Sequence, residues 1–496
     1  MTLGLVERLS TSYPSSKYLR RFRNLSNSEF LGSYEKELSE RCAVFGVYSE
    51  SQNAAALVHT GLWALQHRGQ EASGIVSLKD GIFVSKKGEG LVNQVYKDKD
   101  LPSLFGKVAI GHNRYATDGG KKHIQPVISK KGLVALSHNG TLPETKKIKK
   151  FLNEKNINVK GLNDSELMQR AIEYYVEEGL SIEDAIKNSY PLFTGAFSLT
   201  IMSEGKLIGL RDSHGVRPLS IGSLKDGGYA LSSETVGLDK IGASFIGDVK
   251  PGEMVVISDK GLEHYQIEKG KEQLDVFEII YFANPDSIFY GKKVNDLRRA
   301  LGRQLAQEMP IEADVVVGVP NTALPAASAY SEEANIRYDP DILHKNSYIH
   351  RTFIDPSPGG REENVRRKFS VMQTPLKGKR VIVVDDSIVR GPTTKVLVEM
   401  LREKGAKEVS VVVTSPPVRY PDFYGINTPR QEGLIASKMS VDKIKEYIGA
   451  DKLYYLSYKG MIKAIGIPEE KLCTSCLTGK YPIDIGENAK HINFSV

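Results

Sequence analysis

A run of four apolar β-branched residues at 381–384 is the sharpest hydrophobic feature of the chain. Such a short apolar run is typical of a buried strand in a parallel sheet. It leads into the acidic pair Asp385 and Asp386, and apolar residues then recur at helical spacing over 396–401. The pattern therefore predicts a strand, a loop and a helix in succession.

Two further patterns extend this prediction along the chain. Residues 295–309 are amphipathic at helical spacing, and residues 314–320, DVVVGVP, predict the preceding strand of the same sheet. In the amino-terminal half, residues 43–48 predict a strand that begins just after Cys42, and residues 53–66 predict a helix. Short apolar runs between glycine-rich turns over 192–257 predict the remaining strands of a sandwich.

The amino-acid composition indicates which class of protein this is. The chain has 496 residues, 40% of them apolar and 26% charged, which suits two or three globular domains. Its net charge of +7 is dispersed, which favours small anionic substrates over nucleic acid. Three cysteines indicate a reducing compartment, with the cytoplasm as the default. No run approaches the ~18 apolar residues of a transmembrane helix, so we expect no membrane partner.

The loop after the first strand carries candidate chemistry. A helix that begins at Gly391 and Pro392 would present unpaired N–H groups to a phosphate, and proline suits the first helical position. Asp385 and Asp386 can hold ribose hydroxyls directly or through Mg²⁺, which prefers oxygen ligands. A 5-phosphorylated ribose fits both features. An ordinary strand, turn and helix with solvated acids is the alternative.

These residues resemble the phosphoribosylpyrophosphate (PRPP) motif of type I phosphoribosyltransferases. The resemblance implies a parallel α/β domain. It also implies that purine-salvage relatives carry an Asp three residues after the acidic pair, where it can take a proton from the base. This chain has Val389 there, so ammonia is favoured as the acceptor. The resemblance implies Mg²⁺ at Thr322, Asp385 and Asp386. The PRPP contacts that it implies are Asp385, Asp386, Ser387, Arg390, Gly391, Thr393, Thr394, Asn321 and Thr322, with Arg366 and Lys368 on a mobile loop.

Two positions depart from that pattern. Asn321 stands where the family usually has Asp, and Pro392 where it has Thr. The first change lowers the negative charge beside pyrophosphate, and the second removes one N–H and one hydroxyl from the phosphate cradle. Both bear on PRPP affinity. For the loop of Arg366 and Lys368, a solvated basic loop is the alternative to closure over pyrophosphate.

The amino-terminal half carries five motifs in order: CAVFGVY (42–48), LQHRGQEASGI (65–75), GHNRYATDGG (111–120), SHNGTL (137–142) and NDSEL (163–167). They resemble the class II glutamine amidotransferases, which implies an N-terminal-nucleophile hydrolase sandwich of αββα type. It also implies that Cys42 becomes the first residue, with its own α-amine as base. The implied oxyanion donors are Asn139 and Gly140, and the implied glutamine contacts are Arg114, Asp164, Arg68 and Thr117.

Together the two halves resemble the amidophosphoribosyltransferase family. This implies that glutamine supplies ammonia, which displaces pyrophosphate from PRPP to give 5-phosphoribosylamine in the first committed step of purine synthesis. We expect a leader at 1–41, a glutaminase domain at 42–273 and a transferase domain at 274–496, with Tyr281 coupling the two sites. The family also implies feedback by purine nucleotides and a homotetramer or dimer. A PRPP-sensing regulator and another class II amidotransferase are the alternatives.

A lone CxxC, Cys473 and Cys476, is half of a four-thiolate site. In iron-sulfur members of the family the two other ligands align with Asp275 and Asp422. Carboxylates are poor cluster ligands, so we expect no [4Fe-4S] cluster, and a zinc ion with two thiolates and two carboxylates is the alternative.

The leader must be removed if the amine of Cys42 is the base. Met1 is the only methionine before Cys42, so removal of an initiator methionine cannot expose that amine. Family members with a propeptide are implied to cleave it autocatalytically. A host protease or a non-AUG start is the alternative.

Overall fold

The computed structural model describes residues 42–51, 53–97, 99–114, 123–346, 360–374, 376–426, 428 and 430–495. The predicted leader 1–41, the proposed glutamine contact Thr117 and most of the segment before Arg361 lie outside these ranges. No helix in the described ranges combines the length and apolar surface that crossing a bilayer requires.

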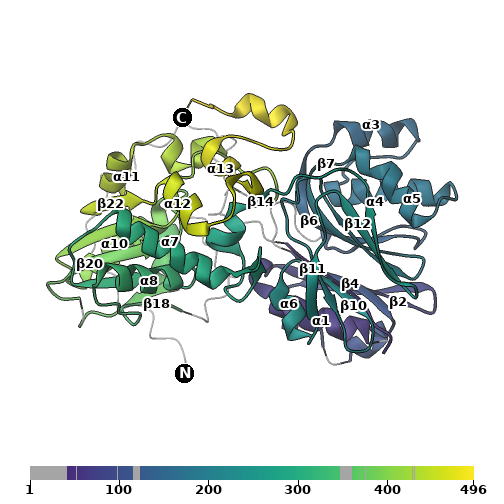
Figure 1. Ribbon diagram of the computed structural model, residues 1–496, viewed down its shortest axis with the longest axis horizontal. Helices are drawn as coiled ribbons and strands as arrows, with labels where there is room; N and C mark the ends of the chain where they lie inside the picture. Colours follow the sequence, from purple (N-terminus) through teal and green to yellow (C-terminus); the bar gives the residue numbers. More distant parts are fainter. Residues whose placement is uncertain are drawn as a thin grey trace, which may run out of the picture. The chain divides into compact units, whose positions relative to one another are not determined.

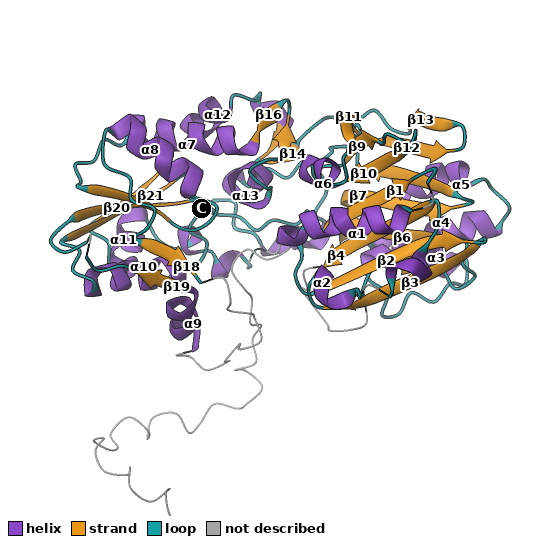
Figure 2. Ribbon diagram, turned by 90° about the horizontal axis from the view of Figure 1, so that it is seen from below, coloured by secondary structure: helices purple, strands orange, loops and turns teal. Residues whose placement is uncertain are grey.

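The amino-terminal half contains two antiparallel sheets (Figures 1 and 2). The strands of the first lie in the order β11 (Ser244–Asp248), β9 (Ser220–Ser223), β10 (Tyr229–Ser232), β1 (Ala43–Tyr48), β4 (Val108–Arg114), β2 (Ala72–Lys79) and β3 (Ile82–Glu89). Those of the second lie in the order β13 (Gly261–Gln266), β12 (Glu253–Ser258), β8 (Lys206–Arg211), β7 (Thr194–Ser203), β6 (Ala135–Glu144) and β5 (Val127–Ile128).

The two sheets pack face to face through apolar side chains. Val44 and Ile110 of the first sheet meet Leu207 and Val255 of the second in one buried cluster. Helices α1 (Ala54–Ala64) and α6 (Thr235–Lys240) cover the outer face of the first sheet. Helices α3 (Lys146–Glu154), α4 (Asp164–Glu177) and α5 (Ile182–Ser189) cover the outer face of the second (Figure 1). The predicted αββα sandwich is confirmed.

The carboxyl-terminal half is built on a parallel sheet, which confirms the second fold prediction. Its strands lie in the order β17 (Val315–Gly318), β20 (Arg380–Asp385), β21 (Glu408–Val413) and β22 (Lys452–Tyr455). Alternate side chains of β20 enter two cores: Ile382 packs with helices α7 (Val294–Glu308), α8 (Leu324–Ala334) and α12 (Tyr458–Ile465). Val383 packs with α10 (Pro392–Glu403) and α11 (Val441–Ile448) on the other face.

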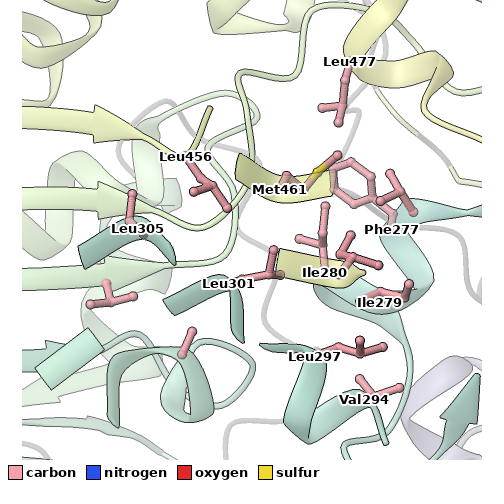
Figure 3. Packing of buried hydrophobic residues seen from close by; sticks show 14 of the residues in the cluster. Phe277, Ile279, Ile280, Val294, Leu297, Leu301, Leu305, Leu456, Met461 and Leu477 are labelled. Carbon is pink, nitrogen blue, oxygen red and sulfur yellow. The ribbon is translucent and has the colours of Figure 1, made fainter. Parts of the chain in front are cut away.

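A short π-helix, η5 (Glu278–Phe282), joins the two halves. Figure 3 shows Ile279 and Ile280 lying among side chains of α7, with Phe277 beside Met461 of α12. Just before it, β14 (Leu274–Asp275) pairs in parallel with β23 (Leu472–Cys473), which leads into α13 (Ser475–Thr478). The residues that follow the predicted boundary at Leu274 therefore pack into the transferase core.

The basic segment 361–370 differs from the predicted loop. It forms helix α9 (Gly360–Lys368), followed by strand β19 (Phe369–Val371), which pairs with β18 (Leu343–Lys345). Glu362 and Glu363 lie in the first helical turn, while Arg366, Arg367 and Lys368 lie in the last. This charge order complements the helix dipole, and it explains why a sequence so rich in charge is helical.

Candidate active sites

Cys42 lies at the entrance of β1, and its side chain is partly exposed. Strand β1 runs antiparallel to β4, with Ala43 opposite Asn113, so the start of β1 and the end of β4 at Arg114 share one edge. His112 of β4 is hydrogen-bonded through Nε2 to the carbonyl of His138 on β6, at 3.1 Å. That contact joins β4 to β6 at the residue just before Asn139.

Asn139 and Gly140 form the next part of this site. Asn139 is 3% exposed, and its Nδ2 makes no hydrogen bond with the part of the chain that the structure describes. Gly140 has φ +140°, and a methyl group on it would lie only 2.0 Å from the carbonyl oxygen of Ala196. A buried donor that lacks a partner is costly unless a ligand supplies one, and a developing oxyanion is such a ligand.

Asp164 lies at the start of α4, where the helix dipole favours a carboxylate. Its Oδ1 accepts from the N–H of Ser165 at 2.8 Å, and its Oδ2 accepts from the N–H of Leu142 at 3.2 Å. His138 Nδ1 lies 3.8 Å from Oδ2, but burial lowers the pKa of His138 and outweighs the nearby carboxylate. The imidazole of His138 therefore does not neutralise Asp164, and this carboxylate can face an ammonium group.

Arg68 contacts the nucleophile through the main chain. Its Nε donates to the carbonyl of Cys42 at 3.1 Å, and its side chain is almost fully buried. Two of its nitrogens donate to Glu278 at 2.8 and 2.7 Å, and Nη1 also donates to Glu234 at 2.5 Å. Burial opposes the charge of Arg68, but these carboxylates outweigh it and raise its pKa. Arg68 lies beside Cys42 as a buried, fully charged group.

The second site lies at the carboxyl edge of the parallel sheet. Strands β17 and β20 are neighbours in register, with Gly318 opposite Val384, so residues 321–322 and 385–386 follow strands that end side by side. Asp385 and Asp386 are 7% and 8% exposed, and Ser387 Oγ donates to Asp386 Oδ1 at 2.9 Å. Thr322 follows the Pro320–Asn321 peptide, which is cis.

Helix α10 begins where the sequence predicts, with Pro392 as its first residue. Gly391 precedes it at φ +91°, a conformation that glycine adopts without strain. Thr394 is buried in the first turn, beside Thr393. The amide groups of this turn therefore open toward the same edge of the sheet that carries the acidic pair, as a phosphate cradle requires.

Both halves of the chain match known protein families. Residues 112–240 match the family model of the glutamine amidotransferase domain, and residues 286–419 match that of the phosphoribosyl transferase domain. The amidophosphoribosyltransferase of Synechococcus elongatus is 44% identical over 91% of this chain and 93% of its own length. That of Bacillus subtilis is 42% identical over 91% of this chain and 96% of its own length.

The chain belongs to the amidophosphoribosyltransferase family. An amidophosphoribosyltransferase is a glutamine-dependent transferase that forms 5-phosphoribosylamine from PRPP, the first step of purine biosynthesis, and this is the function of the chain. Two solved structures agree with this assignment. The Bacillus subtilis glutamine PRPP amidotransferase complexed with ADP and GMP has a TM-score of 0.83 at 42% identity, covering 90% of this chain and 98% of that one. A structure described as the allosteric regulatory enzyme of purine biosynthesis has a TM-score of 0.84 at 41% identity, covering 92% of this chain and all of that one.

Arg366 and Lys368 lie on α9. Arg366 makes two hydrogen bonds of 2.8 Å to Glu403 of α10 and lies 3.5 Å from Glu399. Lys368 Nζ lies 5.2 Å from the ring centroid of Phe369. Exposed ion pairs of this kind contribute about 0 to 1 kcal/mol, so Arg366 can leave Glu403 at little cost.

Three buried charged residues near Cys42 were not predicted from the sequence: Glu234, Glu278 and Arg217. Arg217 donates to Glu278 at 3.0 Å and lies 3.1 Å from Asp275 and 3.8 Å from Asp422. Arg217 lies outside the five motifs of the amino-terminal half. The available signal was Glu278 itself, because a lone acid inside the apolar run 276–280 indicates a buried charge that needs a cation.

The side chains around Arg217 include those that align with the iron-sulfur ligands of other family members. This group contains only two thiols, Cys473 and Cys476, and burial raises the pKa of both. The two carboxylates that replace the other ligands face a guanidinium instead. This donor set does not fit an iron-sulfur cluster, which four thiolates hold. Within the described ranges, no group of three or more His, Cys, Asp or Glu side chains is arranged to hold a metal ion.

The acidic pair, in contrast, fits Mg²⁺. Asp385 and Asp386 supply hard carboxylate oxygens next to a proposed pyrophosphate site, and Thr322 could add a hydroxyl. Magnesium commonly takes one or two carboxylates and completes its shell with substrate oxygens and water. Two protein carboxylates are therefore sufficient if PRPP brings the remaining ligands.

Proposed function

We propose that Cys42 releases ammonia from glutamine and that Asp385 and Asp386 hold the PRPP on which this ammonia acts. The observation that carries the proposal is the buried Nδ2 of Asn139, which has no partner among the described residues and lies where β6 meets the strands that carry Cys42 and Arg114. Such a donor suits an oxyanion that exists only during the reaction.

In the glutaminase step, the α-amine of Cys42 takes the thiol proton and the thiolate attacks the carboxamide carbon of glutamine. The tetrahedral oxyanion accepts hydrogen bonds from Asn139 Nδ2 and the Gly140 N–H, each contributing about 3 kcal/mol. Collapse breaks the C–N bond and passes the proton to the departing ammonia, which leaves a glutamyl thioester for water to hydrolyse. Arg114 holds the α-carboxylate of glutamine and Asp164 its α-ammonium, and Arg68 and Thr117 are proposed as further glutamine contacts.

In the transferase step, ammonia attacks C1 of the ribose and pyrophosphate leaves with inversion. Asp385 and Asp386 hold the ribose hydroxyls, and the amides of residues 391–394 hold the 5-phosphate, assisted by Ser387 and Arg390. Asn321 and Thr322 bind pyrophosphate. A bound Mg²⁺ would neutralise charge on the leaving group. Movement of Arg366 and Lys368 toward pyrophosphate would exclude water from the site.

We further propose that ammonia passes internally between the sites and that Tyr281 couples them. Support comes from the position of Tyr281 in η5, which packs into the transferase core while its neighbour Glu278 binds Arg68 of the glutaminase site. Purine nucleotides are proposed as feedback inhibitors, because a relative at 42% identity was solved with ADP and GMP. A homotetramer or dimer and a cytoplasmic location complete the proposal.

The test is a paired assay. Purified protein given PRPP, Mg²⁺ and glutamine should release pyrophosphate and glutamate in equal amounts, and ammonium salts should replace glutamine in pyrophosphate release. Glutamate release without pyrophosphate would leave only a glutaminase. Pyrophosphate release that responds to neither nitrogen source would refute amidotransfer.

The leader gives a separate prediction. An amide-bound nitrogen cannot serve as a base, so we propose that residues 1–41 are removed between Arg41 and Cys42. Intact-mass and N-terminal sequencing of active protein should therefore show Cys42 first. Cys42→Ser should block this cleavage if the chain cleaves itself, whereas cleavage of that variant would indicate a host protease. Active protein that begins at Met1 would contradict the amine-base mechanism.

A further inference from the structure

A loop of the transferase domain touches the backbone of Gly140. A methyl group added to Gly425 would lie 3.0 Å from Cα of Gly140, 3.3 Å from its carbonyl carbon and 3.2 Å from Nε of Arg217. Ordinary contacts of such a methyl group with carbon are about 3.5 to 4.0 Å. The backbone of Gly140 can therefore lie this close to Gly425 because Gly425 has no side chain.

Gly140 also lies close to strand β7 of its own domain. A methyl group on Gly140 would overlap the carbonyl oxygen of Ala196 on β7, at 2.0 Å, and Gly140 pairs with Phe197 of the same strand. Strand β7 and Gly425 thus both lie against the backbone of Gly140, whose N–H is the proposed oxyanion donor. Strand β7 belongs to the glutaminase sandwich, whereas Gly425 follows β21 of the transferase sheet.

The loop that carries Gly425 is well anchored. The carbonyl of Tyr424 accepts from Nε of Arg217 at 2.8 Å. Asp422 Oδ1 accepts from the N–H groups of Tyr424 and Ile426, at 2.8 and 3.0 Å, which closes a turn around Gly425. The hydroxyl of Tyr424 donates to the carbonyl of Ile483 at 2.6 Å. Gly425 can therefore act as a fixed support for the backbone of Gly140.

The same loop begins beside the acidic pair. Thr414 N–H donates to the carbonyl of Asp385 at 2.9 Å, and Ser415 N–H donates to the carbonyl of Asp386 at 3.1 Å. Gly425 lies eleven residues after Thr414 in the same segment. One continuous segment therefore connects the proposed PRPP carboxylates with the proposed oxyanion site.

We propose that Gly425 is a positioning residue for glutamine hydrolysis: the transferase domain completes the oxyanion site by holding the Gly140 peptide against β7. This inference rests on the proposed function of Gly140. An oxyanion donor works only within about 2.7 to 3.1 Å of the oxyanion, so a displacement of a few tenths of an ångström weakens it selectively in the transition state.

The test compares Gly425→Ala with Gly261→Ala. Gly261 has φ +95° and open space around an added methyl group, whereas Gly425 has φ +114° and the contacts above, so Gly261→Ala controls for backbone strain. In Gly425→Ala we expect kcat with glutamine to fall about tenfold, since misplacement by 1 Å can cost about 100-fold, with KM for glutamine within about twofold. Ammonia-dependent synthesis should match that of the control.

Ammonia-dependent synthesis also reports folding of the transferase domain. If Gly425→Ala loses the glutamine and ammonia reactions equally, or retains glutamine turnover like Gly261→Ala, the positioning role is refuted. Should Gly425→Ala fail to fold, Arg217→Lys, which removes the hydrogen bond to Tyr424, must show the same selective loss of kcat. A failure of the proposed function can be told apart from a failure of the Gly425 proposal. If the proposed function is wrong, Cys42→Ala in the otherwise unaltered chain still turns over glutamine.

Discussion

Replacement of Cys42 by alanine should abolish glutamine-dependent synthesis of 5-phosphoribosylamine and leave ammonia-dependent synthesis intact. The thiolate is the only group proposed to attack the carboxamide, and removal of a catalytic nucleophile typically lowers kcat by at least about 1,000-fold. The transferase site uses ammonia whatever its source, so an ammonium salt bypasses the lesion. Pyrophosphate release measured with each nitrogen source separates the two reactions.

Cys476→Ala is the matched control. It removes the same atoms from a buried position in the transferase domain, where burial keeps the thiol protonated by raising its pKa. Both reactions should continue in this variant, with a loss of stability of about 1 to 3 kcal/mol from the cavity. Glutamine-dependent turnover by Cys42→Ala would refute the nucleophile assignment, and loss of the ammonia reaction would show that the two sites are not chemically separate.

The double substitution Asp385→Asn and Asp386→Asn should remove both the glutamine-dependent and the ammonia-dependent reactions. Asparagine keeps the shape of the acidic pair but takes away the two charges proposed to hold Mg²⁺ and the ribose hydroxyls, so pyrophosphate release should fall by at least about 100-fold. Basal hydrolysis of glutamine should persist, because Cys42, Asn139 and Gly140 are unchanged. Pyrophosphate and glutamate release from the same samples measure both effects.

Asp442→Asn is the control for this experiment, since Asp442 is an exposed carboxylate on α11 of the same domain. It should leave both reactions within about twofold of the unaltered chain, as surface substitutions usually do. If the double variant still consumes PRPP at the control rate, the ribose and metal site is not at the end of β20. If it also loses glutamine hydrolysis, the acidic pair supports the glutaminase site as well.

The strongly periodic parts of the fold were predictable from the sequence. Four apolar β-branched residues gave β20 its place in a parallel sheet, and Pro392 marked the first residue of α10. Both signals act within a few residues, so no knowledge of the rest of the fold was needed. The αββα sandwich was reached through the family resemblance, with periodicity supplying its individual strands.

Contacts between distant segments were not predictable. Arg217 and Glu278 meet across 61 positions, and the backbone of Gly425 touches Gly140. The sequence can indicate that Glu278 is buried, but it does not identify the partner in either contact, because each contact depends on how distant layers of the fold meet. The error at α9 has a different cause: helix formation there depends on charge order along the helix, whereas the loop was inferred from resemblance alone.

The buried charges beside η5 limit how this protein can be divided. Arg68 and Arg217 belong to the glutaminase sandwich, but Glu278, which binds both, and Asp275 belong to the segment that follows residue 273. Removing the partner of a buried charge costs about 3 to 5 kcal/mol, a large share of the stability of one domain. A chimera built by exchanging this glutaminase module for another would therefore inherit unpaired carboxylates, and the natural unit of exchange includes residues 275–278.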